Sequence, residues 1–214
     1  MEKGGPLAEI LAMEDPQRQG EAIAEYASSL EPGDPALMDA FVAAVAELDP
    51  GLGTTSRVKD AVLPRLSAEQ VAEAVSFLAA RARETASIRD QKERFSRDKL
   101  AAWDVARLAP YVREGAFDAL FGIVESMGYD AARGHAIFGL APHVPPPLAD
   151  RLRALASDFS AEDRTKLEEA LGRIDYDQRK RFTHDPRPRT TASASSRSST
   201  RSRRCSATAT RSFR

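Results

Sequence analysis

Three histidines are the first candidates for chemistry in this 214-residue chain. His135, His143 and His184 are the only histidines, and no cysteine or second histidine stands at ligand spacing from any of them. A zinc site needs three or four donors that converge on one point. We therefore predict that His135 lies on a helix surface and His143 in a turn, and we predict no metal ligand.

The segment "GLGTTS" at residues 51–56 is the second candidate, because its glycines superficially match those of a phosphate-binding loop. It lacks the lysine that follows the second glycine of a Walker A motif, and no strand is predicted before it. We interpret the segment as a turn between helices, with Thr55 or Ser56 as the N-cap of the next helix. No cofactor-binding residue is predicted.

Carboxylates are abundant, for example Glu125, Asp130, Glu168 and Glu169. A pair of them has catalytic meaning only when depth and separation suit a reaction, and the sequence supplies neither. We therefore predict no catalytic residue, and we do not expect an enzyme.

The elements that would position these groups are helices, because apolar residues recur at helical spacing and alternating, strand-like runs are absent. The loop "EPGDP" at 31–35 ends one helix and lets Pro35 stand in the first turn of the next, so the two form an antiparallel hairpin. Ser67 and Gln70 have the spacing of a capping box that opens a helix over 68 to about 85. The charged stretch 83–99 is expected to contain a helix end and a restart.

The helix that follows carries Ala101, Val105 and Leu108 on one face, while Leu100 and Trp103 lie off that face. This pattern is typical of a helix that packs on two sides. An exposed tryptophan is a frequent hot spot of protein binding, but a tryptophan inside an apolar helix is more often buried. We predict Trp103 in the core.

The tripeptide Leu-Ala-Pro occurs twice, at 108–110 and 140–142, which is a separation of 32 residues. In both copies the proline blocks continuation of the helix, and a valine, Val112 or Val144, follows within two residues. A period of this size is typical of stacked helical repeats. Asp130-Ala131-Ala132-Arg133 precedes the second copy, and Asp15-Pro16-Gln17-Arg18 has the same spacing with Asp15 placed as an N-cap.

These residues resemble bacterial HEAT-like helical repeats, in which an Asp-x-x-Arg helix start leads to a Leu-Ala-Pro helix end and a second helix. The resemblance covers about 100–172 well and 10–48 loosely, and at 49–99 only Leu63-Pro64 remains of the turn. It implies an all-α, right-handed α-solenoid of antiparallel hairpins, with about nine or ten helices over residues 6–174. Proteins similar to it mostly act as interaction surfaces, although helical-repeat enzymes exist.

Charge divides the chain into two domains. Residues 1–177 hold 20 basic and 31 acidic side chains, a net charge of −11, whereas residues 178–214 hold 11 basic residues and one acid, a net charge of +10. The second segment is rich in Arg, Ser and Thr and nearly lacks aliphatic residues, so we expect a disordered tail. An abrupt change after Tyr176 is also what reading a GC-rich gene out of frame would give, and the sequence leaves both explanations open.

The predicted function is non-catalytic protein binding, as a scaffold, through an acidic helical-repeat surface that prefers a basic partner. The alternative is a nucleic-acid-associated protein that binds weakly through 178–214, and a helical-repeat enzyme comes third. The single cysteine, Cys205, fits a reducing compartment. Together with the lack of a signal peptide or of a membrane span, this predicts a cytoplasmic location.

Overall fold

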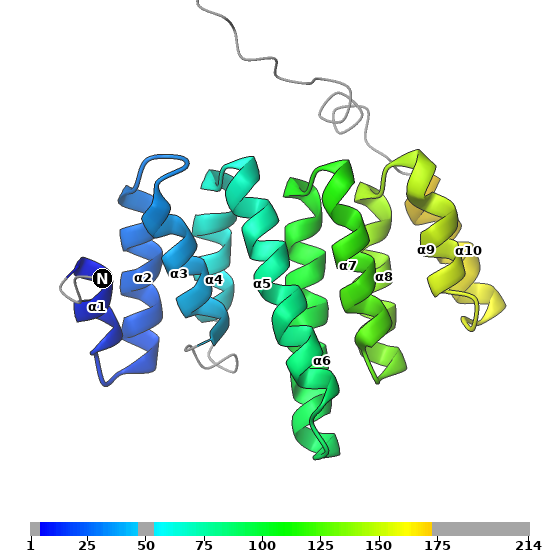
Figure 1. Cartoon of the computed structure of the whole chain (residues 1–214), viewed down its shortest axis with the longest axis horizontal. Helices are drawn as coiled ribbons and strands as arrows, with labels where there is room; N and C mark the ends of the chain where they lie inside the picture. The colour runs from blue at the N-terminus through cyan, green and yellow to red at the C-terminus, as the bar shows by residue number, and fades with distance from the viewer. Residues whose placement is uncertain (1–4, 47–53, 173–214) are drawn as a thin grey trace, which may run out of the picture. The chain divides into compact units, whose positions relative to one another are not determined.

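The computed structural model of the chain describes residues 5–46 and 54–172, and these contain ten α-helices and no β-strand. The predicted all-α class, with nine or ten helices, is confirmed for these ranges. Figure 1 shows the helices side by side in chain order. They are α1 (Pro6–Leu11), α2 (Pro16–Ser29), α3 (Pro35–Ala46), α4 (Thr54–Val62), α5 (Ala68–Ala86), α6 (Gln91–Leu108), α7 (Phe117–Ser126), α8 (Asp130–Leu140), α9 (Ala149–Leu155) and α10 (Ala161–Gly172).

The helices pack in two interleaved series. α2 packs against α4 and α6 against α8, while α3 packs against α5 and α5 against α7. Neighbours in the chain, such as α2 and α3 or α6 and α7, join the two series. One continuous apolar core runs between them, and its largest fully buried side chains include Phe41, Phe117 and Phe121.

Two glycines allow close contacts between helices. A Cβ atom added at Gly20 of α2 would lie 2.4 Å from Thr54 Cβ of α4, and one added at Gly139 of α8 would lie 2.3 Å from Ala106 Cβ of α6. Both distances are far below the contact distance of two carbon atoms, so a larger residue at either position would push the helices apart.

Side-chain caps open five of the ten described helices, namely α2, α3, α5, α6 and α10. Asp15 accepts hydrogen bonds from the backbone amides of Gln17 and Arg18, and Ser67 and Gln70 form the predicted capping box at the start of α5. The predicted cap at Thr55 or Ser56 is wrong, because α4 already begins at Thr54 and both residues lie within its first turn. Thr54, Thr55 and Ser56 are consecutive hydroxyl residues, so the sequence did not determine at which of them the helix begins.

The two Leu-Ala-Pro segments fold into the same structure. Each ends an α-helix at its leucine, continues as a 3₁₀ turn (Ala109–Tyr111 and Ala141–His143) and reaches a buried valine in extended geometry. Val112 has φ −80° and ψ 133°, and Val144 has φ −69° and ψ 127°. A second 3₁₀ turn then leads into α7 or α9, so the geometry recurs with the sequence period.

A third copy of this turn lies where the sequence retained only Leu63-Pro64. The segment Leu63–Arg65 forms a 3₁₀ turn after α4, and Leu66 follows it with φ −63° and ψ 138°. The Ser67 capping box takes the place of the second 3₁₀ turn. The departure from the motif at this point therefore keeps the first 3₁₀ turn and replaces the second by a direct helix start.

The segment 178–214, with His184 and Cys205, lies outside the described residues, as do 173–177 and 47–53. The tail prediction and the domain boundary at 177 therefore stay predictions. In the ranges that are described, each helix is too short or too polar to cross a lipid bilayer.

Candidate functional site

The outer face of α6 carries three large apolar side chains that are exposed to solvent. Phe95, Leu100 and Trp103 are 42%, 37% and 47% exposed, and the only other large apolar side chain exposed among the described residues is Met13. The prediction that Trp103 is buried in the core is therefore wrong. Leu100 and Trp103 lie off the buried face, as the pattern indicated, but no helix covers them.

The inner face of α6 packs as predicted at Val105 and Leu108, which are fully buried, but Ala101 is only partly buried and its neighbour Ala102 is buried instead. On its other side α6 meets α8 through Ala106 and Gly139, and this contact leaves the indole of Trp103 at the surface. There it stacks on His135 of α8, with ring centroids 4.7 Å apart. The predicted surface position of His135 is confirmed.

A groove runs beside Trp103, between α6 and α4, with a volume of about 460 Å³. One wall is α6, where Phe95, Lys99 and Trp103 follow one another at intervals of four residues along a single stripe. The other wall is α4. The lining residues are Thr55, Ser56 and Lys59 of α4 and Phe95, Ser96, Lys99, Leu100, Trp103, Asp104 and Arg107 of α6.

A buried ion pair joins the two walls. The Lys59 ammonium donates a hydrogen bond to the Asp104 carboxylate, and the two side chains are only 8% and 6% exposed. Burial raises the pKa of the Asp104 carboxyl above its ordinary value, while the nearby cations Lys59, Arg107 and Arg81 act in the opposite direction. Because one carboxylate is surrounded by cations, the charge of the groove is positive.

Arg107 holds the same two helices together nearer the surface. Its guanidinium donates to the Ser56 backbone carbonyl and to the Asp60 carboxylate, both at 2.9 Å. Lys99, by contrast, has no carboxylate within ion-pair distance among the residues that the structure describes. It is therefore the cation of the groove most available to a ligand.

The N-terminal half of α6 is held in place by the turn between α7 and α8. Buried Asp98 accepts a hydrogen bond from the Gly128 amide at 2.8 Å, and the Tyr129 hydroxyl donates to the Gln91 carbonyl at 2.7 Å. The ring of Tyr129 also meets Phe95 edge to face at 5.0 Å. This end of the groove is therefore fixed by contacts from another helix pair.

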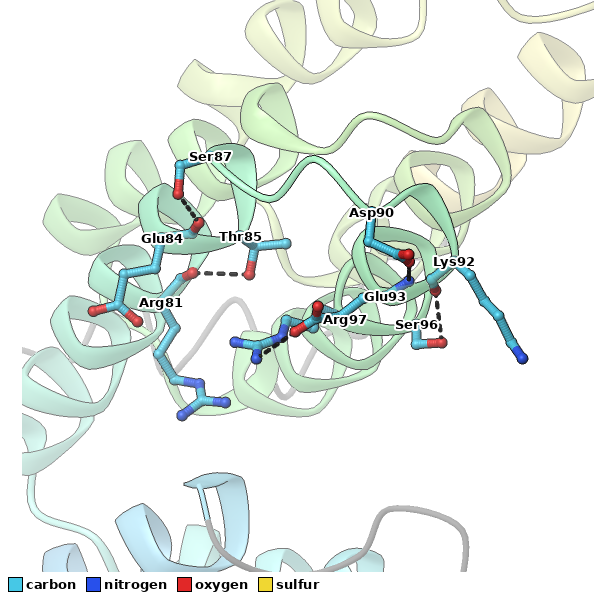
Figure 2. A network of polar contacts seen from close by, with 9 residues as sticks. All are labelled: Arg81, Glu84, Thr85, Ser87, Asp90, Lys92, Glu93, Ser96 and Arg97. Atoms are coloured by element: carbon cyan, nitrogen blue, oxygen red, sulfur yellow. Dashed lines mark hydrogen bonds and ion pairs between the residues drawn. The ribbon is translucent and has the colours of Figure 1, made fainter.

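The α5–α6 turn begins this helix, and it projects beyond the other helix ends in Figure 1. Figure 2 shows its polar contacts: the Asp90 carboxylate accepts from the Glu93 amide and caps α6, and Arg97 pairs with Glu93 one helical turn further on. On the α5 side the Thr85 hydroxyl donates to the Arg81 carbonyl. These are local contacts within each helix end.

A second hollow, of about 520 Å³, lies between α8 and the start of α10. Arg133 lines it and pairs with Asp130 and Asp158. Polar and apolar side chains line this hollow in similar measure, and it is more acidic than the α4–α6 groove.

Three of the four carboxylates named from the sequence are held by separate arginines. Glu125 lies 3.6 Å from Arg151, Asp130 pairs with Arg133, and Glu168 forms a bidentate pair with Arg153. No group of three or more His, Cys, Asp or Glu side chains in the described ranges could hold a metal ion. His143 lies in the 3₁₀ turn after α8, which agrees with its predicted position.

The acidic charge is not spread evenly over the described helices. Residues 5–46 contain one basic and eight acidic side chains, whereas residues 54–172 contain 17 basic and 18 acidic ones. The acidic surface predicted from the net charge is therefore a property of α1–α3, and the α4–α6 groove lies outside it.

The exposed tryptophan and its cationic groove were missed by the sequence analysis, which had only helical periodicity to separate buried from exposed positions. Comparison with protein-family models, with curated proteins and with solved structures gave no match for this chain.

Proposed function

We propose that the chain is a non-catalytic protein-interaction module that binds its partner at the Trp103 face of α6. The observation that carries this proposal is the exposure of Phe95, Leu100 and Trp103 on one helix, beside a groove. Tryptophan is enriched at binding hot spots because it buries a large area with little loss of conformational freedom. Isolated exposed apolar residues need no explanation, but a contiguous group beside a hollow marks an interaction site.

The recurring 3₁₀ turn supports a repeat architecture of the HEAT-like, right-handed solenoid kind, and we include that architecture in the proposal. Helical hairpins that stack bury their apolar faces against one another and leave an extended surface for a partner. The acidic side chains of α1–α3 suit a basic partner region, as the sequence analysis expected, and they form a different surface from the α4–α6 groove.

The experiment is site-specific photo-crosslinking with the full-length chain in a lysate of the source organism. Benzoylphenylalanine replaces Phe95 in one bait and Met13 in a matched bait, because both residues are exposed to a similar degree but lie far apart in the sequence. We expect one protein to be crosslinked from position 95 and not from position 13, and to be lost when Trp103→Ala is added. Equal capture from both positions, or capture that ignores Trp103→Ala, would exclude this face as the binding site.

A second function rests on the +10 charge of residues 178–214, which suits weak, salt-sensitive nucleic-acid binding. It predicts that a chain ending at residue 177 loses affinity for nucleic acid. Affinity that survives the truncation would remove the tail hypothesis.

A further inference from the structure

The α4–α6 groove combines an apolar surface with positively charged side chains. Leu100 and Trp103 give it an exposed apolar wall, and Lys99 and Arg107 place two cations within the same lining. A partner must therefore offer an apolar side chain and an anionic group a few ångströms apart.

The buried pair adds to the positive character of the groove. A lysine ammonium has three N–H donors, and among the described residues Lys59 donates to the Asp104 carboxylate, so capacity to donate remains. Asp104 cannot offset the other cations, because Lys59 already neutralises it. Asp60 pairs with Arg107 at the rim, and Lys99 forms no ion pair with any carboxylate of residues 5–46 and 54–172.

We infer that this groove binds an acidic peptide segment of a partner protein, in which an Asp or Glu stands next to an aromatic or aliphatic residue. The apolar side chain lies against Leu100 and Trp103, and the carboxylate pairs with Lys99 at the exposed end. The inference rests on the proposed function and names the chemistry of the partner.

The geometry favours a peptide over a nucleic acid. Non-specific binding of a single strand needs a row of cations along the backbone and aromatic faces open to successive bases. Here one face of Trp103 is already stacked on His135, and Arg107 is already held by Asp60 and by the Ser56 carbonyl. A volume of about 460 Å³ accommodates a few peptide side chains.

The test begins with a phage library of random 12-residue peptides selected on the full-length chain. The basic segment 178–214 would also attract acidic peptides, so clones that bind the full-length Trp103→Ala chain are discarded. Peptides from the remaining clones are then synthesised and titrated against the wild-type chain. Because Trp103 is the only tryptophan in the protein, its fluorescence reports binding at this face when the titrated peptide contains no tryptophan.

The matched pair of variants is Lys99→Glu and Lys92→Glu, which change the same charge on the same helix, only the first of them in the groove lining. We expect the selected peptides to be acidic with an aromatic or aliphatic neighbour, and their affinity to fall at least tenfold in Lys99→Glu but less than twofold in Lys92→Glu. Circular dichroism of the two variants checks that both are folded.

Two results would overturn the inference and leave the proposed function standing: selected peptides that are basic or uncharged, or Trp103-dependent binding that is equal in Lys99→Glu and Lys92→Glu. Quenching of Trp103 by a 20-nucleotide oligothymidylate with loss in Lys99→Glu, without any selected peptide, would assign the groove to nucleic acid instead. The proposed function itself fails if the position-95 crosslink is absent, if positions 13 and 95 capture equally, or if capture from position 95 ignores Trp103→Ala.

Discussion

The α2–α4 contact and the α6–α8 contact are built in the same way but present different surfaces. In each, a glycine lets the helices approach closely, Gly20 against Thr54 in the first and Gly139 against Ala106 in the second. Across the first contact, Arg57 and Glu21 form an exposed ion pair at 3.3 Å. Across the second, Trp103 stacks on His135.

The difference shows that this kind of helix contact does not need an aromatic pair at its edge. An exposed ion pair serves at α2–α4 and is worth little to stability, so the packing alone does not account for a half-exposed tryptophan at α6–α8. The Lys59–Asp104 pair lies between the two contacts, because α4 belongs to the first and α6 to the second. We therefore expect the two contacts to be similar in packing energy and to differ in whether a partner binds beside them.

The largest effect is expected from Lys59→Met, which leaves Asp104 buried without its main partner. Removal of one member of a buried ion pair costs about 3–5 kcal/mol of the free energy of unfolding, and urea denaturation followed by circular dichroism measures it. The double variant Lys59→Met, Asp104→Leu removes both charges and should recover most of that loss. If the double variant is no more stable than the single one, the Lys59–Asp104 pair does not join α4 to α6 in the way described above.

Gly139→Val and Gly20→Val should each destabilise the protein by about 1–3 kcal/mol or more, because the new side chains overlap Ala106 and Thr54. The matched control is Gly122→Ala in α7, where an added Cβ meets nothing within 4 Å. A gain of up to about 1 kcal/mol is expected there from helix propensity. Thermal and urea unfolding compare the three variants, and equal behaviour of Gly122→Ala and Gly139→Val would contradict the close approach of α6 and α8.

Trp103→Ala should cost about 1 kcal/mol, on the scale of one aromatic pair, and Arg57→Ala less than about 1 kcal/mol. For comparison, Phe121→Ala in the core should cost about 3–5 kcal/mol. Urea denaturation of the three variants places Trp103 on this scale. A loss at Trp103 as large as that at Phe121 would make Trp103 a packing residue and weaken the case for binding.

The smallest effect concerns the contact between α9 and α10, where Arg153 donates to both oxygens of Glu168 at 2.7 and 2.8 Å. This pairing lowers the pKa of the Glu168 carboxyl. The stabilisation it gives is present above the unfolded pKa of about 4.3 and is lost as the pH falls through the lower, folded value. Carbon-detected NMR titration should show the carboxyl pKa of Glu168 rising toward its ordinary value in Arg153→Met, with no change in Lys166→Met.

Short-range interactions made the helical class predictable, together with the helix ends at Asp15, at Ser67 and at the Leu-Ala-Pro turns. Asp15, Ser67 and the prolines of the Leu-Ala-Pro turns act within four residues of their own positions, so their effect is visible in a short stretch of sequence. At Leu63-Pro64 the same turn forms with fewer of the motif residues, which shows that the backbone path tolerates more variation than the pattern suggested.

The candidate site could not be predicted in the same way, because it depends on which helices become neighbours. Lys59 and Asp104 are 45 residues apart, and nothing near either one signals the other. Periodicity placed Trp103 off the buried face of its helix, but it could not show that Trp103 is exposed to solvent. Whether another helix buries that side depends on how closely α8 approaches at Gly139.

The recurring turn also bears on how such a gene can change in length. The block 109–140 begins directly after one helix-ending leucine and stops at the next, and the backbone follows the same path at both points. A tandem duplication or a deletion of that block would create junctions that already exist in the native chain. We therefore expect homologous chains to differ in length by whole blocks of about 32 residues more readily than by partial ones.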